Sequence, residues 1–310
     1  MKRIVGLVVI NIILIVVLKL TTPYFLTVDN ILVLVNNLAL EAIVLGGYTL
    51  LLISGHFDLS VDGIVALTGI TVGLLIVNGM AWPLASFLAL CVAALVGIIN
   101  GFVVVKMKVN GLIATLTTWW ICLGITFGMT RAIAPFGFPE LFQALGQTKF
   151  LGLRTAVLFA IIVIIILSII LHFHKTGAHI YAVGDNKQSS AMMGINATKL
   201  GIKLYVLVAL LAGFVAILLT SRNNAASPMA VDGMALRVIA AVVIGGGNLS
   251  GGKGTIIGGL LGLCIMGILS NAIIHWGVSP YWQKSLLGGV LLVAVLSERL
   301  KLITRSVRNV

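Results

Sequence analysis

Charged residues and cysteines are scarce in this 310-residue chain. Only 9% of the residues are charged, and 8 residues are acidic, whereas soluble domains carry about 25% charged residues. The three cysteines, Cys91, Cys122 and Cys264, each lie inside an apolar run and lack the spacing of metal ligands. These shortages exclude a separate soluble domain and favour cysteines that act as small buried apolar residues.

Signatures of catalysis are also missing from the sequence. No GxxxxGK[ST] phosphate loop occurs, so the chain does not hydrolyse ATP by itself. A membrane-embedded enzyme would need a clustered catalytic set, but the five histidines are dispersed, at positions 56, 172, 174, 179 and 275. We therefore expect no catalytic residue, no metal and no cofactor.

Apolar residues dominate what is present. They make up 60% of the chain, and the mean hydropathy is +1.19. This composition predicts an all-α polytopic membrane protein with one transmembrane domain over residues 1–310. A span needs roughly 20 apolar residues. Ten segments qualify, namely 4–20, 31–53, 62–79, 83–105, 112–130, 155–171, 203–220, a short one at 234–246, 255–275 and 283–298.

Basic residues are scattered singly between the apolar runs, although the net charge is +12. A nucleic-acid-binding surface gathers its basic residues on one face, so we expect no nucleic-acid partner. With the N-terminus in the cytoplasm, 13 of the 20 basic residues fall in inner loops and six in outer loops. This bias favours ten spans with both termini cytoplasmic. No small-residue cleavage site follows the first apolar run, so we expect that run to be a retained span.

Glycines interrupt the apolar stretch over residues 238–283. Each glycine in a helix interior costs roughly 1 kcal/mol relative to alanine, and interrupted backbone in a bilayer must find partners in protein or water. The stretch therefore predicts a helix that stops, turns through a close-packed elbow and re-enters. The alternative is a glycine-rich loop between two ordinary spans. The candidate elbow residues are Gly245, Gly246, Ser250 and Gly252.

A second predicted elbow, over residues 54–63, joins the second and third spans. It is too short for a free loop, and it contains Gly55, Asp58 and Ser60. Its Asp58-Leu59-Ser60 is similar to Asn248-Leu249-Ser250 of the later elbow. Both elbows fall on the predicted cytoplasmic side and lead into an inward-to-outward helix. This similarity suggests a parallel internal repeat, as found in some transporters.

Two longer polar segments separate other spans. Residues 172–202 form the largest predicted cytoplasmic loop, in which Asp185-Asn186 can cap a short amphipathic helix that ends at Gly194. That helix is either a docking surface or a helix lying flat in the lipid interface. Residues 131–154, on the outer side, are either a re-entrant or interfacial helix or a surface for an external partner.

Charged and polar residues fall inside two predicted spans. Glu41 is near the middle of the second span, with Asn37 one turn before it, and Arg237 lies early in the eighth. Charges at mid-membrane usually face protein or water and find partners. We expect the Asn37–Glu41 face to meet the translocation pathway or the eighth span, with Arg237 as a partner. The alternative is that Arg237 extends outward and Glu41 is protonated.

Three motifs resemble those of the permease subunits of bacterial ABC importers for ribose and other simple sugars, which are distantly related to the branched-chain amino acid permeases. Residues 54–61, SGHFDLSV, are similar to the family's TGGIDLSVG. Residues 176–186, TGAHIYAVGDN, followed by Met193-Gly194-Ile195, are similar to its GRYIYAIGGN…SGI. The third motif comprises residues 239–246, 249–252 and 277–283. Order and spacing match over residues 30–300.

The resemblance implies a pore-forming subunit in the bacterial inner membrane. Its implied partners are a second permease in a homo- or heterodimer, two cytoplasmic ATP-binding subunits and a periplasmic solute-binding protein. Residues 177–195 would form the coupling helix that rests on the ATPase. The implied coupling residues are Gly177, Tyr181, Gly184, Asp185, Asn186, Met193 and Gly194.

The chain departs from the family pattern in two places. Gly55-His56-Phe57 replaces the usual Gly-Gly-Ile, and Arg237 lies where an acid is usual. Both departures are compatible with a heterodimer whose other half carries the usual residues. An ion-coupled secondary transporter is the alternative function, because Glu41 and Asp58 are acids in or beside spans.

Overall fold

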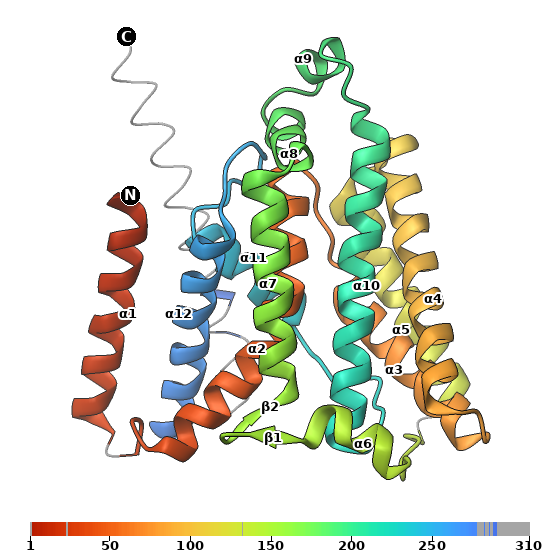
Figure 1. Ribbon diagram of the computed structural model, residues 1–310, viewed down its shortest axis with the longest axis vertical. Coiled ribbons are helices and arrows are strands. Elements are labelled where there is room, and N and C mark those ends of the chain that lie inside the picture. Colours follow the sequence, from red (N-terminus) through yellow and green to blue (C-terminus); the bar gives the residue numbers. More distant parts are fainter. Residues whose placement is uncertain are drawn as a thin grey trace.

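The protein is a bundle of helices in the computed structural model (Figure 1). The structure describes residues 2–22, 24–131 and 133–277, and beyond them only 282, 285, 288 and 289. The elements are α1 (Lys2–Thr21), α2 (Val28–Ile53), α3 (Val61–Val77), α4 (Trp82–Gly101), a π-helical turn η1 (Phe102–Lys106), α5 (Gly111–Thr130), α6 (Glu140–Gln147), β1 (Lys149–Phe150), β2 (Leu153–Arg154), α7 (Thr155–Phe173), α8 (Lys175–Asp185), α9 (Lys187–Met192), α10 (Ala197–Asn223), α11 (Met234–Ile244) and α12 (Ile256–His275).

The predicted all-α polytopic membrane class is confirmed. In the described part of the chain, seven helices are long and apolar enough to cross a membrane, and α3 and α11 are shorter apolar helices. These nine helices correspond to the first nine predicted spans. The tenth predicted span, 283–298, and the basic C-terminal tail lie outside the described residues, so the count of ten stays a prediction.

Helices α2 and α10 form the centre of the bundle. The apolar run from Ala39 to Ile53 of α2 is almost wholly buried, because α7, α10, α11 and α12 all pack against α2. Helix α10 packs in turn against α2, α3, α4 and α6. Small residues bring α4 and α10 close together, and a Cβ added at Gly97 would lie 2.9 Å from the Cα of Val206.

The two ends of the bundle differ. The start of α1 lies at the same end as α8 and α9, whereas α6 and the β1–β2 hairpin lie at the opposite end (Figure 1). This arrangement agrees with the predicted placement of the N-terminus and residues 172–202 on one side and of residues 131–154 on the other. Residues 131–154 do not span the bundle. Helix α6 buries Phe142 and leaves Leu141 exposed, as expected for a short amphipathic helix.

Residues 172–202 fold into two short helices rather than one. The predicted helix is α9, in which the Asn186 side chain accepts hydrogen bonds from the N–H groups of Gln188 and Ser189 at 2.9 and 3.0 Å. Gly194 follows it with φ +77°. The pattern of apolar residues did not predict α8, because its buried side is only Gly177, Ile180 and Val183. That narrow side packs against the end of α7. The single coupling helix that the resemblance implied over residues 177–195 is instead divided at Asn186 into α8 and α9.

Candidate functional site

Helix α11 begins inside the bundle rather than at its edge. Its 11 residues rise roughly 16 Å, which is about half of the 30 Å hydrocarbon core of a bilayer. The preceding residues, 224–233, contain no helix and enter the interior from the end where α6 lies (Figure 1). The first N–H groups of a helix have no partners within that helix. At this depth they need partners from the protein.

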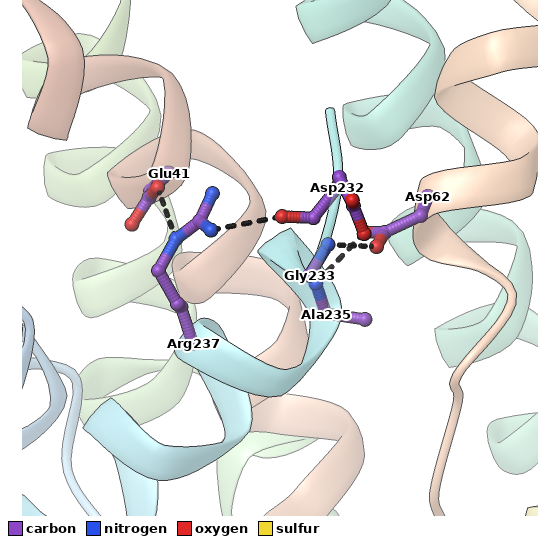
Figure 2. A network of polar contacts seen from close by, with 6 residues as sticks. All are labelled: Glu41, Asp62, Asp232, Gly233, Ala235 and Arg237. Carbon is purple, nitrogen blue, oxygen red and sulfur yellow. Dashed lines mark hydrogen bonds and ion pairs between the residues drawn. The ribbon is translucent and has the colours of Figure 1, made fainter. Parts of the chain in front are cut away.

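Asp62, in the first turn of α3, supplies those partners. Its Oδ2 accepts a hydrogen bond from the N–H of Gly233, and its Oδ1 accepts one from the N–H of Ala235, both at 2.8 Å (Figure 2). The side chain is 3% exposed. A carboxylate is stabilised at the positive end of a helix dipole. Asp62 therefore joins the start of α3 to the start of α11.

Glu41 and Arg237 form an ion pair beside this junction. The Nε of Arg237 donates to the Oε1 of Glu41 at 2.8 Å. Its Nη1 donates to the backbone carbonyl of Asp232 at 3.0 Å (Figure 2). The two side chains are only 22% and 15% exposed. The expected contact is therefore present, and the alternative in which Arg237 extends away from Glu41 is wrong.

A polar cavity of about 480 Å³ lies against the ion pair. Helices α2, α10, α11 and α12 contribute to its wall. Arg222 of α10 donates to the Oδ1 of Asn37 at 2.8 Å, so Asn37 and Glu41 line the same wall, as their spacing predicted. The volume lies within the range of small-molecule sites. Polar lining residues are Asn37, Glu41, Arg222, Asn223, Asp232, Arg237, Ser270 and Asn271.

The two predicted elbows pack directly against each other. The N–H of Gly252 donates to the carbonyl of Ile53 at 2.8 Å. A Cβ added at Gly251 would lie 2.8 Å from the Cα of Gly55. Helix α8 completes the junction, because the Tyr181 hydroxyl donates to the Gly254 carbonyl at 2.8 Å and a Cβ at Gly184 would overlap the Ile53 carbonyl. We call this contact region of residues 53–55, 181–185 and 251–254 the elbow junction.

The similar sequences in the two elbows form the same turn. The Oδ1 of Asp58 accepts a hydrogen bond from the N–H of Ser60 at 2.7 Å, and the Oδ1 of Asn248 accepts one from the N–H of Ser250 at 2.9 Å. Both are Asx turns. Asp58 and Ser60 are fully buried, whereas Ser250 is exposed. The shared turn supports the predicted repeat at the local level, and the larger repeat stays a prediction.

Most of the predicted site residues fall into three groups. Asn37, Glu41 and Arg237 line the cavity. Gly55, Tyr181, Gly184 and Gly252 meet in the elbow junction, with Asp185 next to Gly252. Gly177 holds α8 against Leu171, Asn186 caps α9, and Met193 and Gly194 are exposed beyond it. Asp58, Ser60 and Ser250 instead belong to the two Asx turns, Gly245 packs against Gly258, and Gly246 lies beside Arg3. Asp62 was not among the predicted site residues, because no sequence signal connects it with Gly233 and Ala235 across 171 and 173 positions.

Comparisons with known proteins agree with this architecture. Residues 27–296 match the family model described as the branched-chain amino acid transport system / permease component. The chain belongs to this permease family. A multi-pass permease component is a membrane subunit of a transport system, so the polar cavity and the elbow junction are parts of a permease. No group of three or more His, Cys, Asp or Glu side chains that could hold a metal occurs among the described residues.

Curated relatives of this permease match nearly its whole length. It is 36% identical over 291 residues to the ribose import permease protein RbsC of Bacillus subtilis, covering 93% of this chain and 90% of the relative. It is 35% identical to the RbsC of Escherichia coli K12, covering 93% and 91%. It is 32% identical to the L-arabinose ABC transporter permease protein AraH of Azospirillum brasilense, covering 95% and 87%. No solved structure matches the chain.

Glycine is required at two elbow positions for different reasons. A Cβ at Gly245 would overlap the backbone of Gly258, and Gly252 has φ +74°. We expect Gly245→Val and Gly252→Val each to lower the melting temperature of the purified protein, because overpacking costs about 1–3 kcal/mol and left-handed backbone about 1–2 kcal/mol. Gly6→Val in α1 is the control, since no atom lies within 4 Å of its added Cβ. Equal melting temperatures in all three variants would contradict the assignment.

The ion pair predicts a charge-swap pattern in transport. Glu41→Arg and Arg237→Glu, made singly, should each impair solute uptake, because breaking a buried pair costs about 3–5 kcal/mol. The double variant should recover part of the uptake. The two single variants are the controls for charge reversal itself, because the double variant contains both reversed charges. A double variant no better than the worse single variant would rule out a functional pair.

Proposed function

We propose that this chain is the permease subunit of a binding-protein-dependent ABC importer for a simple sugar. The observation that carries the proposal is the polar cavity around Glu41 and Arg237, set inside an apolar bundle. Relatives with 32–36% identity are named as permeases for ribose and L-arabinose. The matched family supports a permease component, and the sugar is inferred from the relatives and from the chemistry of the cavity.

The cavity suits a polyhydroxylated solute. Every sugar hydroxyl can both donate and accept a hydrogen bond. Glu41 offers acceptor oxygens, Arg222 and Arg237 offer donors, and Asn271 offers both. The cavity lies beside the start of α11, so these groups lie near the middle of the bundle. We infer that a sugar passing through the permease contacts this wall, whereas the binding protein selects which sugar is delivered.

The end of the bundle with α8 and α9 is proposed to face the cytoplasm and the ATP-binding subunits. Met192 and Met193 are 89% and 66% exposed there. Helix α8 contacts both elbows, and these elbows adjoin α2 and α11, which carry Glu41 and Arg237. Movement of α8 on its ATPase would therefore reach both walls of the cavity. Alternating access requires contacts that differ between the two states of a transporter, and such a movement of α8 would change the contacts at the cavity. The N-terminus would then be cytoplasmic, and the predicted tenth span would place the C-terminus on the same side.

A second permease subunit is proposed to pack on α5. In the apolar 18-residue stretch of helix α5, only 22% is buried within the chain. Gly124 and Gly128 are one turn apart on its exposed side, and an added Cβ at either would meet no atom within 4 Å. Small residues at this spacing let helices approach closely in membranes. The periplasmic solute-binding protein is proposed to dock at the end of the bundle that carries α6 and the β1–β2 hairpin.

An ion-coupled secondary transporter is disfavoured by the same geometry. Such a transporter needs acids that bind and release coupling ions. Glu41 is paired with Arg237, and Asp62 binds two backbone N–H groups. The Oδ1 of Asp58 accepts hydrogen bonds from the N–H and the hydroxyl of Ser60. The family match is to a transport-system permease component.

Transport by the reconstituted complex tests the proposed function. The chain would be co-reconstituted in proteoliposomes with the ATP-binding subunit and solute-binding protein encoded beside it. We expect uptake of radiolabelled ribose or arabinose that requires both ATP and the binding protein. Uptake driven by a proton or sodium gradient without ATP would refute the importer assignment.

Coupling through α9 predicts a loss of stimulated ATP hydrolysis. Met192→Glu and Met193→Glu should abolish stimulation by the loaded binding protein, because a charge buried in a packed groove carries an uncompensated desolvation cost. Membrane insertion should be unchanged, since both side chains are exposed. Met192→Leu and Met193→Leu, which keep an apolar side chain at each position, are the matched controls and should retain stimulation. Gly184→Arg is a poorer test, because it would also disrupt the elbow junction. Normal stimulation in both Met192→Glu and Met193→Glu would favour a helix that lies in the lipid interface.

A further inference from the structure

The β1–β2 hairpin contains two local features that destabilise it. Leu151 and Gly152 form its two-residue turn, and both have positive φ, at +52° and +80°. Such a turn prefers asparagine or aspartate before the glycine, because left-handed backbone crowds the Cβ of most other residues. Lys149 and Arg154 are directly opposite each other in the hairpin, and like charges in that position repel. A two-stranded hairpin is marginally stable at best even without these features.

Apolar side chains are exposed at the tip of the hairpin. Leu151 is 85% exposed and Phe150 is 66% exposed. Asparagine at position 151 would suit both the left-handed backbone and the contact with water, so leucine is unfavourable there in two ways. Backbone strain of this kind concentrates where a protein binds a ligand or a partner. The tip therefore has the properties of a surface that another molecule covers.

Contacts with the bundle hold the hairpin in a defined orientation. The N–H of Arg154 donates to the Oδ1 of Asn36 in α2 at 2.8 Å. Leu153 packs against the main apolar core. Side chains alternate between the two faces of a strand. The face that carries Lys149 and Arg154 is therefore turned away from that core.

The hairpin lies at the end of the bundle toward which the cavity at Glu41 extends (Figure 1). Asn37 lines that cavity and directly follows Asn36, which anchors the hairpin. Three helices line the cavity with residues close to their ends on this side, namely Val33 of α2, Asn223 of α10 and Ile274 of α12. A partner that covers the hairpin is therefore close to the route by which a solute from this side reaches the cavity.

The charge of this outer segment is positive. Residues 131–154 contain three basic residues, Arg131, Lys149 and Arg154, and one acid, Glu140. None of the three cations forms an ion pair within the part of the chain that the structure describes. Lipid surrounds the sides of a membrane protein, whereas the hairpin lies across the end of the bundle (Figure 1). An acidic surface of a soluble protein therefore fits the hairpin better than lipid headgroups do.

We propose that the hairpin is a docking element for the solute-binding protein, with Leu151 in an apolar depression of that protein and Lys149 and Arg154 against acidic side chains at its rim. This inference rests on the proposed importer function and adds the docking element and the surface chemistry of its partner. Docking would bury the apolar tip and place counter-charges beside the two opposed cations. Of the two alternatives for residues 131–154, it selects the surface for an external partner.

A substitution that suits the turn separates docking from a structural role. Leu151→Asn supplies the preferred turn residue, so the melting temperature of the purified protein should not fall. Affinity for the solute-binding protein encoded beside the chain should nevertheless fall at least about tenfold, because burial of a leucine side chain is lost. Biolayer interferometry on the assembled importer in phosphatidylcholine nanodiscs measures this affinity. Leu151→Met, which keeps an apolar side chain, is the matched control and should bind normally. A melting temperature that falls together with the affinity would make Leu151 a structural residue and overturn the proposal.

Charge variants at Lys149 test the acidic rim. Lys149→Glu should weaken binding about tenfold at low salt, mainly through slower association, and added salt should reduce this difference. Lys149→Arg keeps the charge and should bind normally. Equal affinities of Lys149→Glu and the unaltered protein at low salt would overturn the acidic rim.

Uptake measurements separate this inference from the proposed function. Unchanged affinity in both Leu151→Asn and Lys149→Glu, with ATP-dependent uptake intact, would overturn docking at the hairpin and leave the importer assignment in place. Lost uptake with unchanged affinity in Leu151→Asn would show that the tip acts in the lipid interface, and would also overturn the proposal. Absence of ATP-dependent uptake by the unaltered complex would refute the proposed function and the docking inference with it.

Discussion

The contact between Asp62 and the first N–H groups of α11 is the constraint on which the interior depends. A helix that starts in the middle of an apolar bundle leaves backbone donors that lipid cannot satisfy. Asp62 accepts from two of them at 2.8 Å. Because α11 begins there, Arg237 in its first turn is held within 2.8 Å of Glu41 on α2. The polar cavity exists because α11 begins in the middle of the bundle and carries Arg237 there, while the neighbouring α2 carries the opposite charge of Glu41.

The elbow junction connects this interior to the surface of the bundle. Backbone groups rather than side chains make most of the contact, as the hydrogen bond from Gly252 to Ile53 shows. Backbones can approach this closely only where glycine removes the Cβ, as at Gly184 and Gly251. Packed elements of this kind shift between discrete arrangements rather than deform continuously. A helix on the surface can therefore be coupled to a cavity halfway across the protein.

Local sequence features predicted most of the secondary structure. The apolar runs predicted the nine helices of the described spans, because an apolar run of about the length of the hydrocarbon core is stable in a bilayer as a spanning helix. The cap at Asn186 and the positive φ of Gly194 followed from residue types whose local geometry is nearly independent of the rest of the fold. The apolar pattern alone missed α8, because only three of its residues are buried and it packs against the end of α7.

The sequence by itself determined the membrane class, the nine apolar helices of the described spans, the glycine elbows and the need of Glu41 and Arg237 for partners, since each depends on residues close together in the chain. Tertiary structure alone decided which groups meet. Asp62 and Gly233 are 171 positions apart, and Asp62 could equally have paired with a lysine or faced water. Arg222 and Asn37 likewise meet only in the folded bundle, since they are 185 positions apart in the chain. Burial and hydrogen bonding between distant segments set these properties, and no local pattern records them.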